Sequence, residues 1–284
     1  MSVLILGNGL VAQAVAAELP NAVVVGHDRF DIRDHDSLVR LVREERPDAC
    51  VNTVAMHKLA ECEAGPTEAF DINAKGAERI ASLVPTLYIS TDYVFDSGGP
   101  HDEAMPGRQP RSVYGRSKLA GELATLEHDG IVVRISGVFD ERFESHKGRS
   151  FAEMVASTYS DLRLPNDQVF SPTYAKDAAE RIVGLVRGMS ERVQADIKGI
   201  FHAANAGSVS WADFAKYIST RAGRPRRKIA GFEAKDPIRP TNSALRSTRL
   251  MPLRSWMLAT DAWIEARQAR LYVTRPVSPL RGNA

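Results

Sequence analysis

The sequence predicts an α/β protein built on a doubly wound parallel sheet. In the first half of the chain, short apolar runs alternate with segments whose apolar residues recur at helical spacing. The pattern begins with the run Val3–Leu6 and the helical stretch 10–19. Buried strands that alternate with helices form a parallel sheet through right-handed crossovers. The remaining strand-like runs lie at 22–25, 50–52, 87–89 and 130–135, and the remaining helical stretches at 34–46, 67–84 and 117–126.

The composition excludes several classes of partner. Of the 284 residues, 44% are hydrophobic and 25% charged, and the net charge is +2. This ordinary balance gives no electrostatic reason to expect nucleic acid or a membrane as partner. Cys50 and Cys62 stand outside any metal or redox spacing, and the seven histidines show no ligand-like pairing, so we expect no metal. Neither a signal peptide nor a membrane span is visible, which indicates the cytoplasm.

The first strand and helix are joined by a turn that reads Gly7-Asn8-Gly9-Leu10-Val11-Ala12. One glycine permits the tight turn, and the second lets the backbone approach a pyrophosphate at the positive end of the helix. The small Ala12 lets helix and strand pack closely. The turn therefore predicts a Rossmann-type sheet that binds a dinucleotide through Gly7, Asn8, Gly9, Leu10 and Val11.

The regular alternation ends near residue 140, beyond which glycines and prolines are scattered between two helical stretches. We expect residues 1–140 to form the dinucleotide-binding domain, completed by segments around 174–202. Residues 141–284 are expected to form a smaller substrate-binding region that interleaves with the first and closes over the ligand edge of the sheet.

The segment after the second strand should meet the adenosine half of the cofactor. Asp28 suits the 2′-hydroxyl of NAD, whereas His27 or Arg29 would neutralise the 2′-phosphate of NADP. Asp31 and Ile32 would flank the adenine. Since both signals are present, we favour NADP(H) as cofactor and keep NAD(H) as the alternative.

Tyr114 and Lys118 are four residues apart and share one face at the start of a helical stretch. A free phenol has a pKa of about 10, and a nearby ammonium stabilises the phenolate, which eases proton exchange near neutral pH. Upstream, Ser90 and Thr91 close a strand at the edge where such sheets bind ligands. Either hydroxyl would hydrogen-bond a substrate carbonyl beside Tyr114, so the set predicts an enzyme.

Several longer motifs surround this pair. They are Arg46-Pro-Asp48, Ala69-Phe-Asp-Ile-Asn73, Ser90-Thr-Asp-Tyr-Val-Phe95, Val113-Tyr-Gly-Arg-Ser-Lys-Leu-Ala-Gly-Glu122, Asn166-Asp-Gln168, Ser171-Pro-Thr173, Gly199-Ile-Phe-His202 and Arg239-Pro-Thr-Asn-Ser243. With these motifs, the chain resembles the dTDP-4-dehydrorhamnose reductase family of extended short-chain dehydrogenases over nearly its whole length.

The resemblance implies an NAD(P)-dependent reductase of a nucleotide-activated keto-sugar, such as a dTDP-4-keto-6-deoxy sugar of deoxysugar biosynthesis. Thr91, Tyr114 and Lys118 would form the catalytic set, with Tyr114 protonating the keto oxygen as the nicotinamide delivers a hydride to the carbon. The cofactor would also border Asn52, Thr53, Val54 and Ala55. The substrate would meet Ser90, Asp92, Tyr93, Phe95, Ser136, Gly137, Asn166, Gln168, Arg239 and Asn242.

The chain departs from this family at three places. Ala12 stands where the last glycine of the turn is usual, Leu59-Ala60-Glu61 replaces a common Val-Asp-Lys segment, and Gly137 replaces a common tryptophan. The last change is expected to open the site beside the cofactor. Some members hold magnesium at a dimer contact through a glutamate on the first helix, where this chain has Ala14, so no metal is expected there either.

Two other functions stay open. A nucleotide-sugar epimerase or dehydratase would use the same scaffold, although the dehydratases carry a glutamate directly after Thr-Asp, where this chain has Tyr93. A regulatory subunit resembling the methionine adenosyltransferase β subunit would bind a dinucleotide and a partner enzyme without catalysis. The intact Thr91, Tyr114 and Lys118 favour catalysis. The chain is expected to act as a monomer or a homodimer.

Overall fold

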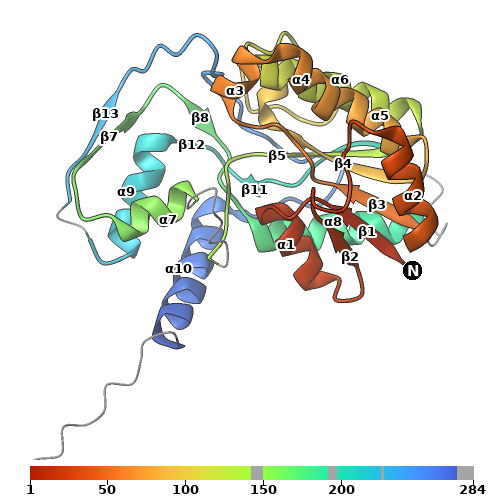
Figure 1. Ribbon diagram of the computed structural model, residues 1–284. Coiled ribbons are helices and arrows are strands. Elements are labelled where there is room, and N and C mark those ends of the chain that lie inside the picture. Colours follow the sequence, from red (N-terminus) through yellow and green to blue (C-terminus); the bar gives the residue numbers. More distant parts are fainter. Residues whose placement is uncertain (142–149, 191–196, 225–226, 274–284) are drawn as a thin grey trace, which may run out of the picture.

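The computed structural model describes residues 1–141, 150–190, 197–224 and 227–273, and its centre is a six-stranded sheet (Figure 1). The strand order is β10-β5-β4-β3-β1-β2 and every neighbouring pair is parallel, so the predicted doubly wound sheet is confirmed. The winding reverses between β1 and β3, which is the point where such sheets bind ligands at their carboxyl ends. The strands are β1 (Val3–Leu6), β2 (Val23–Val25), β3 (Ala49–Asn52), β4 (Thr86–Thr91), β5 (Ile131–Ile135) and β10 (Gly199–His202).

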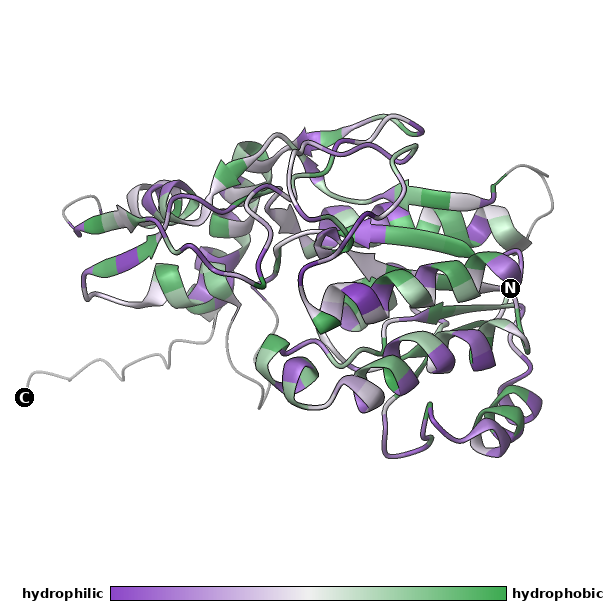
Figure 2. Cartoon of the chain, turned by 90° about the horizontal axis from the view of Figure 1, so that it is seen from above, coloured by the Kyte–Doolittle hydropathy of each residue, from purple (hydrophilic) through white to green (hydrophobic). Residues whose placement is uncertain are grey.

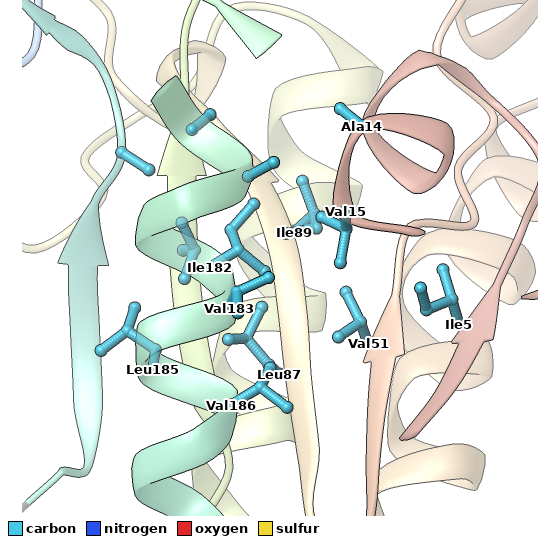
Figure 3. Close-up of a cluster of buried hydrophobic side chains, with 14 of the residues drawn as sticks. Ile5, Ala14, Val15, Val51, Leu87, Ile89, Ile182, Val183, Leu185 and Val186 are labelled. Carbon is cyan, nitrogen blue, oxygen red and sulfur yellow. The ribbon is translucent and has the colours of Figure 1, made fainter. Parts of the chain in front are cut away.

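Helices cover both faces of this sheet because its strands are apolar on both sides, as the hydropathy colouring shows (Figure 2). On one face, α1 (Leu10–Glu18) and α8 (Ala175–Ser190) bury side chains such as Val15 and Ile182 against Ile5, Val51 and Leu87 (Figure 3). Leu4 and Leu6 point to the other face, where they pack with Leu38 of α2 (His35–Glu45).

The single helix predicted over 67–84 is a helical run from Pro66 to Ala81 that contains a π-helical turn. It consists of α4 (Pro66–Phe70), the π turn η1 (Asp71–Lys75) and α5 (Gly76–Ala81), and it follows α3 (Leu59–Ala64). A π turn has looser internal hydrogen bonding than an α-helix. Here the Asn73 carbonyl in the turn accepts the hydroxyl of Tyr88 at 2.7 Å. The turn thus depends on a partner distant in sequence, which helical spacing alone does not reveal.

The second half of the chain forms a separate aromatic core beside the sheet. Phe139, Phe170, Tyr174, Phe214 and Trp263 are its buried aromatic side chains. Short paired strands and helices surround this core. These elements are β6 (Val138–Phe139), α7 (Phe151–Ser157), β7 (Leu162–Pro165), β8 (Val169–Phe170), β9 (Thr173–Tyr174), β11 (Asn205–Ala206), β12 (Val209–Ser210), α9 (Trp211–Arg221), β13 (Ile229–Phe232), β14 (Leu253–Ser255) and α10 (Trp256–Val273).

Among the described residues, no helix is long and apolar enough to span a membrane.

Candidate active site

A cavity of about 1300 Å³ opens at the carboxyl ends of β1, β3 and β4. It brings together residues that are up to 143 positions apart in the chain, from Gly7 to Ser150. Parallel strands end at one edge of the sheet, which gathers most of them there. The residues proposed for the site that line it are Gly7, Asn8, Gly9, Leu10, Val11, His27, Asp31, Ile32, Thr53, Val54, Ala55, Ser90, Thr91, Asp92, Tyr114, Lys118 and Gly137.

The glycine turn has the geometry that a pyrophosphate requires. Gly7 has a φ of +103°, and a Cβ there would lie 2.4 Å from Thr53 Oγ1. A Cβ on Gly9 would meet no described atom within 4 Å, so the backbone at Gly9 is open to the cavity that it lines. Helix α1 begins at Leu10, and no described side chain caps it. Its free N–H groups and positive end therefore fit an anionic dinucleotide.

The part of the cavity lined by His27, Asp31 and Ile32, where adenosine was predicted, contains a guanidinium that the sequence analysis missed. Arg29 donates to Glu45 at 2.8 Å and lies 3.7 Å from Glu44, so it faces helix α2. Arg33 instead lines the cavity, where it forms a forked pair with Asp31 (2.8 Å). An arginine two residues after an aspartate gives no sequence signal of cofactor contact.

Two further residues predicted to border the cofactor are Asn52 and Asp28. Asn52 ends β3 as a buried residue, and its Oδ1 accepts the Val54 amide at 3.0 Å, which shapes the loop that lines the cavity. Asp28 is exposed.

Helix α6 (Val113–Glu127) carries Tyr114 in its first turn and Lys118 in its second. The helix begins four residues earlier than the apolar pattern predicted, because two side chains hold its first amides. Ser112 Oγ accepts the Gly115 amide at 3.0 Å, and Glu63 Oε1 accepts the Val113 amide at 2.6 Å. These caps fix Tyr114 and Lys118 on the face that lines the cavity.

Lys118 is held in a largely apolar setting. Its side chain is 2% exposed, its Nζ donates to the Ile89 carbonyl at 2.7 Å, and the Tyr88 ring lies 3.8 Å below. Burial lowers the pKa of Lys118 to about 7, while the nearby Glu122 acts in the opposite direction. The amine is therefore close to its charge transition at neutral pH.

Tyr114 meets Thr91 at the same edge of the cavity. Burial raises the pKa of Tyr114, a hydrogen bond with Thr91 lowers it, and the charge of Asp92 raises it. The Tyr93 ring stands edge-on to Tyr114 with 5.9 Å between ring centroids. Tyr114 is thus kept in its protonated form, as a proton donor requires.

Ser90 lines the cavity, but its hydroxyl is directed elsewhere. It donates at 2.5 Å to Glu122, which also accepts two hydrogen bonds from Arg134. Glu122 and Arg134 are 1% and 0% exposed. Ser90 therefore anchors the end of β4 to a buried ion pair, and Thr91 is the hydroxyl placed beside Tyr114.

Phe95 also lies away from the cavity in the described structure. It is 2% exposed and stacks on His101 at 3.8 Å, with the Arg134 guanidinium over its ring. Its surroundings are those of a core residue.

The residues proposed for the nucleotide half lie around the segment 236–245. Arg239 donates to the Tyr93 hydroxyl at 2.9 Å and pairs with Asp236 at 3.2 Å. Asn242 donates to the Gly99 carbonyl at 3.0 Å. Burial raises the pKa of Tyr93 to about 12, against the influence of Arg239. Asn166 is exposed and Gln168 is buried, both outside the described cavity lining.

Gly137 lines the cavity. We expected the missing tryptophan to leave the site open at this position. Gly137 has a φ of +50°, and a Cβ there would lie 2.3 Å from Phe170, whose ring stacks on Trp211 at 3.9 Å. An aromatic ring from another segment therefore packs directly against Gly137.

Other residues that line the cavity were missed by sequence reasoning. Met56 and His57 come from the loop after β3, and Ser150 from the second half of the chain. Asn73 fixes this loop, since its side-chain amide bonds the Met56 backbone at 2.8 and 2.9 Å and Ser117 of α6 at 2.9 Å. Glu61 of α3 also lines the cavity, and it lies in the segment 59–61, whose departure from the family the sequence analysis had noted.

Comparison with known proteins agrees with the fold. The family profile described as RmlD substrate binding domain matches residues 1–271, so the chain belongs to this family. It is 33% identical over 280 residues to a dTDP-4-dehydrorhamnose reductase of Sinorhizobium fredii, with 91% of this chain and 92% of the relative covered. It is 32% identical over 279 residues to a dTDP-4-keto-6-deoxy-D-glucose reductase of Streptomyces niveus (89% and 91% covered).

Solved structures give the same result. The crystal structure of dTDP-4-dehydrorhamnose reductase from Bacillus anthracis in complex with NADP superposes with a TM-score of 0.82 at 25% identity, covering 93% of this chain and 99% of that one. A UDP-glucose 4-epimerase of Thermus thermophilus shares the fold with a TM-score of 0.73 at 16% identity (94% and 99% covered). The resemblance to the reductase family predicted from the motifs is confirmed.

Proposed function

We propose that this protein is an NADPH-dependent reductase that converts the keto group of a nucleotide-activated sugar, a dTDP-4-keto-6-deoxy sugar, to an alcohol. The observation that carries the proposal is the convergence of Thr91, Tyr114 and Lys118 on one cavity with the uncapped end of helix α1. The relatives named as dTDP-sugar reductases, and the NADP complex of one of them, support it.

A nicotinamide cofactor held by the glycine turn would supply the hydride. The residues of the chain would supply the proton and the geometry. Tyr114, protonated at neutral pH, donates its proton to the keto oxygen. Thr91 holds that oxygen beside Tyr114 by a hydrogen bond. In its charged form, the buried Lys118 would stabilise the phenolate left on Tyr114.

The wider arrangement follows from the same proposal. Residues 1–140, with the segments around 174–202, would hold the cofactor, and residues 141–284 the nucleotide sugar. Arg239 carries the guanidinium that suits a diphosphate. The enzyme would work in the cytoplasm as a monomer or a homodimer.

The proposal is tested by mixing purified protein with NADPH and a panel of nucleotide-bound 4-keto-6-deoxy sugars while absorbance at the NADPH band is followed. Oxidation of NADPH by the wild type is expected, and Tyr114→Phe should abolish it while NADPH still binds. Binding of NADPH without turnover of any sugar in the panel would instead favour a regulatory dinucleotide-binding subunit.

A further inference from the structure

Helix α3 connects two parts of the cavity wall. It begins shortly after the loop 53–57, whose residues line the cavity. Met56 of that loop and Tyr114 of α6 pack against a small apolar cluster that contains Cys62 of α3 and Val113 of α6. The Cys62 thiol also donates to the Met56 carbonyl at 3.3 Å. The loop expected to border the cofactor and the helical turn that carries Tyr114 are therefore both packed on α3.

The Glu63 side chain joins α3 to the start of α6. Val113 is the first residue of α6, so its amide has no acceptor within the helix, and Glu63 Oε1 accepts it at 2.6 Å from 50 positions away. A carboxylate at the positive end of a helix forms one of the stronger kinds of hydrogen bond. Ser112 bonds instead the Gly115 amide of the same turn at 3.0 Å, so it stabilises the turn without joining it to α3. Glu63 thus fixes the position of the residue directly before Tyr114.

We propose that Glu63 is a positioning residue that holds the phenol of Tyr114 at the correct distance from the cofactor. This inference rests on the reductase function proposed above. In that reaction a proton and a hydride reach adjacent atoms of one keto group, so the proton donor and the cofactor must keep a fixed separation. Glu63 sets this separation because it ties the turn that bears Tyr114 to the helix that packs against the cofactor loop.

Glu63 acts through α6 and not by touching a ligand. Among the described residues, its neighbours Ala64 and Gly65 line the cavity, but Glu63 itself does not. Its carboxylate is directed to the Val113 amide instead. A displacement of about 1 Å at a reacting group slows a reaction on the order of a hundredfold, even when the change lies away from the chemistry. Loss of the Glu63 acceptor is therefore expected to slow the chemical step and to leave both binding sites in place.

Steady-state kinetics with NADPH and a nucleotide-bound 4-keto-6-deoxy sugar test this role. Glu63→Ala should lower kcat by on the order of tenfold to a hundredfold and change KM for either substrate by less than about threefold. Glu63→Gln keeps an oxygen that accepts the same amide, so its kcat should stay within about threefold of the wild type. An unchanged kcat in Glu63→Ala, or a raised KM with unchanged kcat, overturns the proposal. Glu63→Gln as slow as Glu63→Ala does so too, because the hydrogen bond would then not be the cause.

A helix cap outside the site separates positioning from stability. Ser210 caps α9 by accepting the Asp213 amide at 3.1 Å, and it is not among the described residues that line the cavity. Ser210→Ala should lower the urea unfolding midpoint as Glu63→Ala does, but leave kcat unchanged. An equal loss of kcat in both variants would show that general loosening of the fold is responsible, and would contradict the proposal. If Glu63→Ala does not fold, Glu63→Asp, whose carboxylate is one methylene further from the amide, should still lower kcat.

The isotope effect of NADPH deuterated at the transferable position identifies the step that slows. Because a misplaced proton donor slows the chemical step, the isotope effect on kcat in Glu63→Ala should be at least as large as in the wild type. A smaller isotope effect would mean that Glu63 governs a conformational step or product release, which contradicts the proposal. A wild type that turns over no sugar removes the reductase function and this role with it, whereas wild-type turnover with an unimpaired Glu63→Ala removes this role alone.

Discussion

The buried ion pair between Glu122 and Arg134, next to Ser90 at the end of β4, allows a quantitative test of how this part of the protein is packed. Both side chains are essentially unexposed, and Arg134 donates to Glu122 through Nε (2.9 Å) and Nη2 (2.7 Å). Replacing one partner leaves the other charge buried and uncompensated, which costs about 3–5 kcal/mol. Glu122→Gln should therefore lower the free energy of unfolding by about that amount. The end of β4 should loosen as well, because Ser90 shares Glu122.

The assay is urea unfolding followed by circular dichroism, with the midpoint and slope compared between variants. Asp129→Asn is the matched control, since the Asp129–Lys198 pair is well exposed and its removal should leave the unfolding midpoint almost unchanged. The double variant Glu122→Met with Arg134→Met removes both charges and should lose much less than the two single variants add up to. A loss below about 1 kcal/mol in Glu122→Gln would refute the reasoning, since the pair would then be hydrated rather than buried.

Three further outcomes follow from the site. The pKa of Lys118 is about 7 in the folded chain, below its value in the unfolded chain. The free-energy cost of burying the charged amine is therefore full below pH 7 and fades as the pH rises to about 10. Lys118→Met should raise the free energy of unfolding most on the acid side, and urea unfolding at two pH values checks this. Gly9→Ala should leave thermal unfolding unchanged and weaken NADPH binding in a fluorescence titration, because the Cβ of the new alanine would enter open cavity space. A variant that fails to fold would contradict this. Arg29→Ala should change the ratio of NADPH to NADH dissociation constants less than about twofold, since Arg29 is bound to Glu45; a large change would show that Arg29 reads the 2′-phosphate.

The fold was predictable because its signals are local. The alternation of apolar strands and helices, and the glycine turn before α1, depend on residues next to one another, and the parallel sheet and its ligand edge follow from them. Tyr114 and Lys118 share a helical face for the same reason.

The remaining features of the site depend on contacts between distant segments. The π turn at Asn73 is paired with Tyr88 and Met56, and Ser90 is committed to Glu122 rather than to the cavity. Arg29 faces helix α2 because glutamates happen to stand at the end of that helix. Motif matching identifies which residues surround such a site, but only the packing shows which way each side chain points.

The central claim is a transfer of hydride to a sugar carbonyl with Tyr114 as the proton donor. Its most direct test is incubation with NADPH deuterated at the transferable nicotinamide position and a dTDP-4-keto-6-deoxy sugar, followed by NMR of the product. The account predicts one deuterium on the former keto carbon in the wild type and, in Tyr114→Phe, product formation slowed at least about a hundredfold. Absence of deuterium at that carbon, or undiminished turnover by Tyr114→Phe, would contradict it.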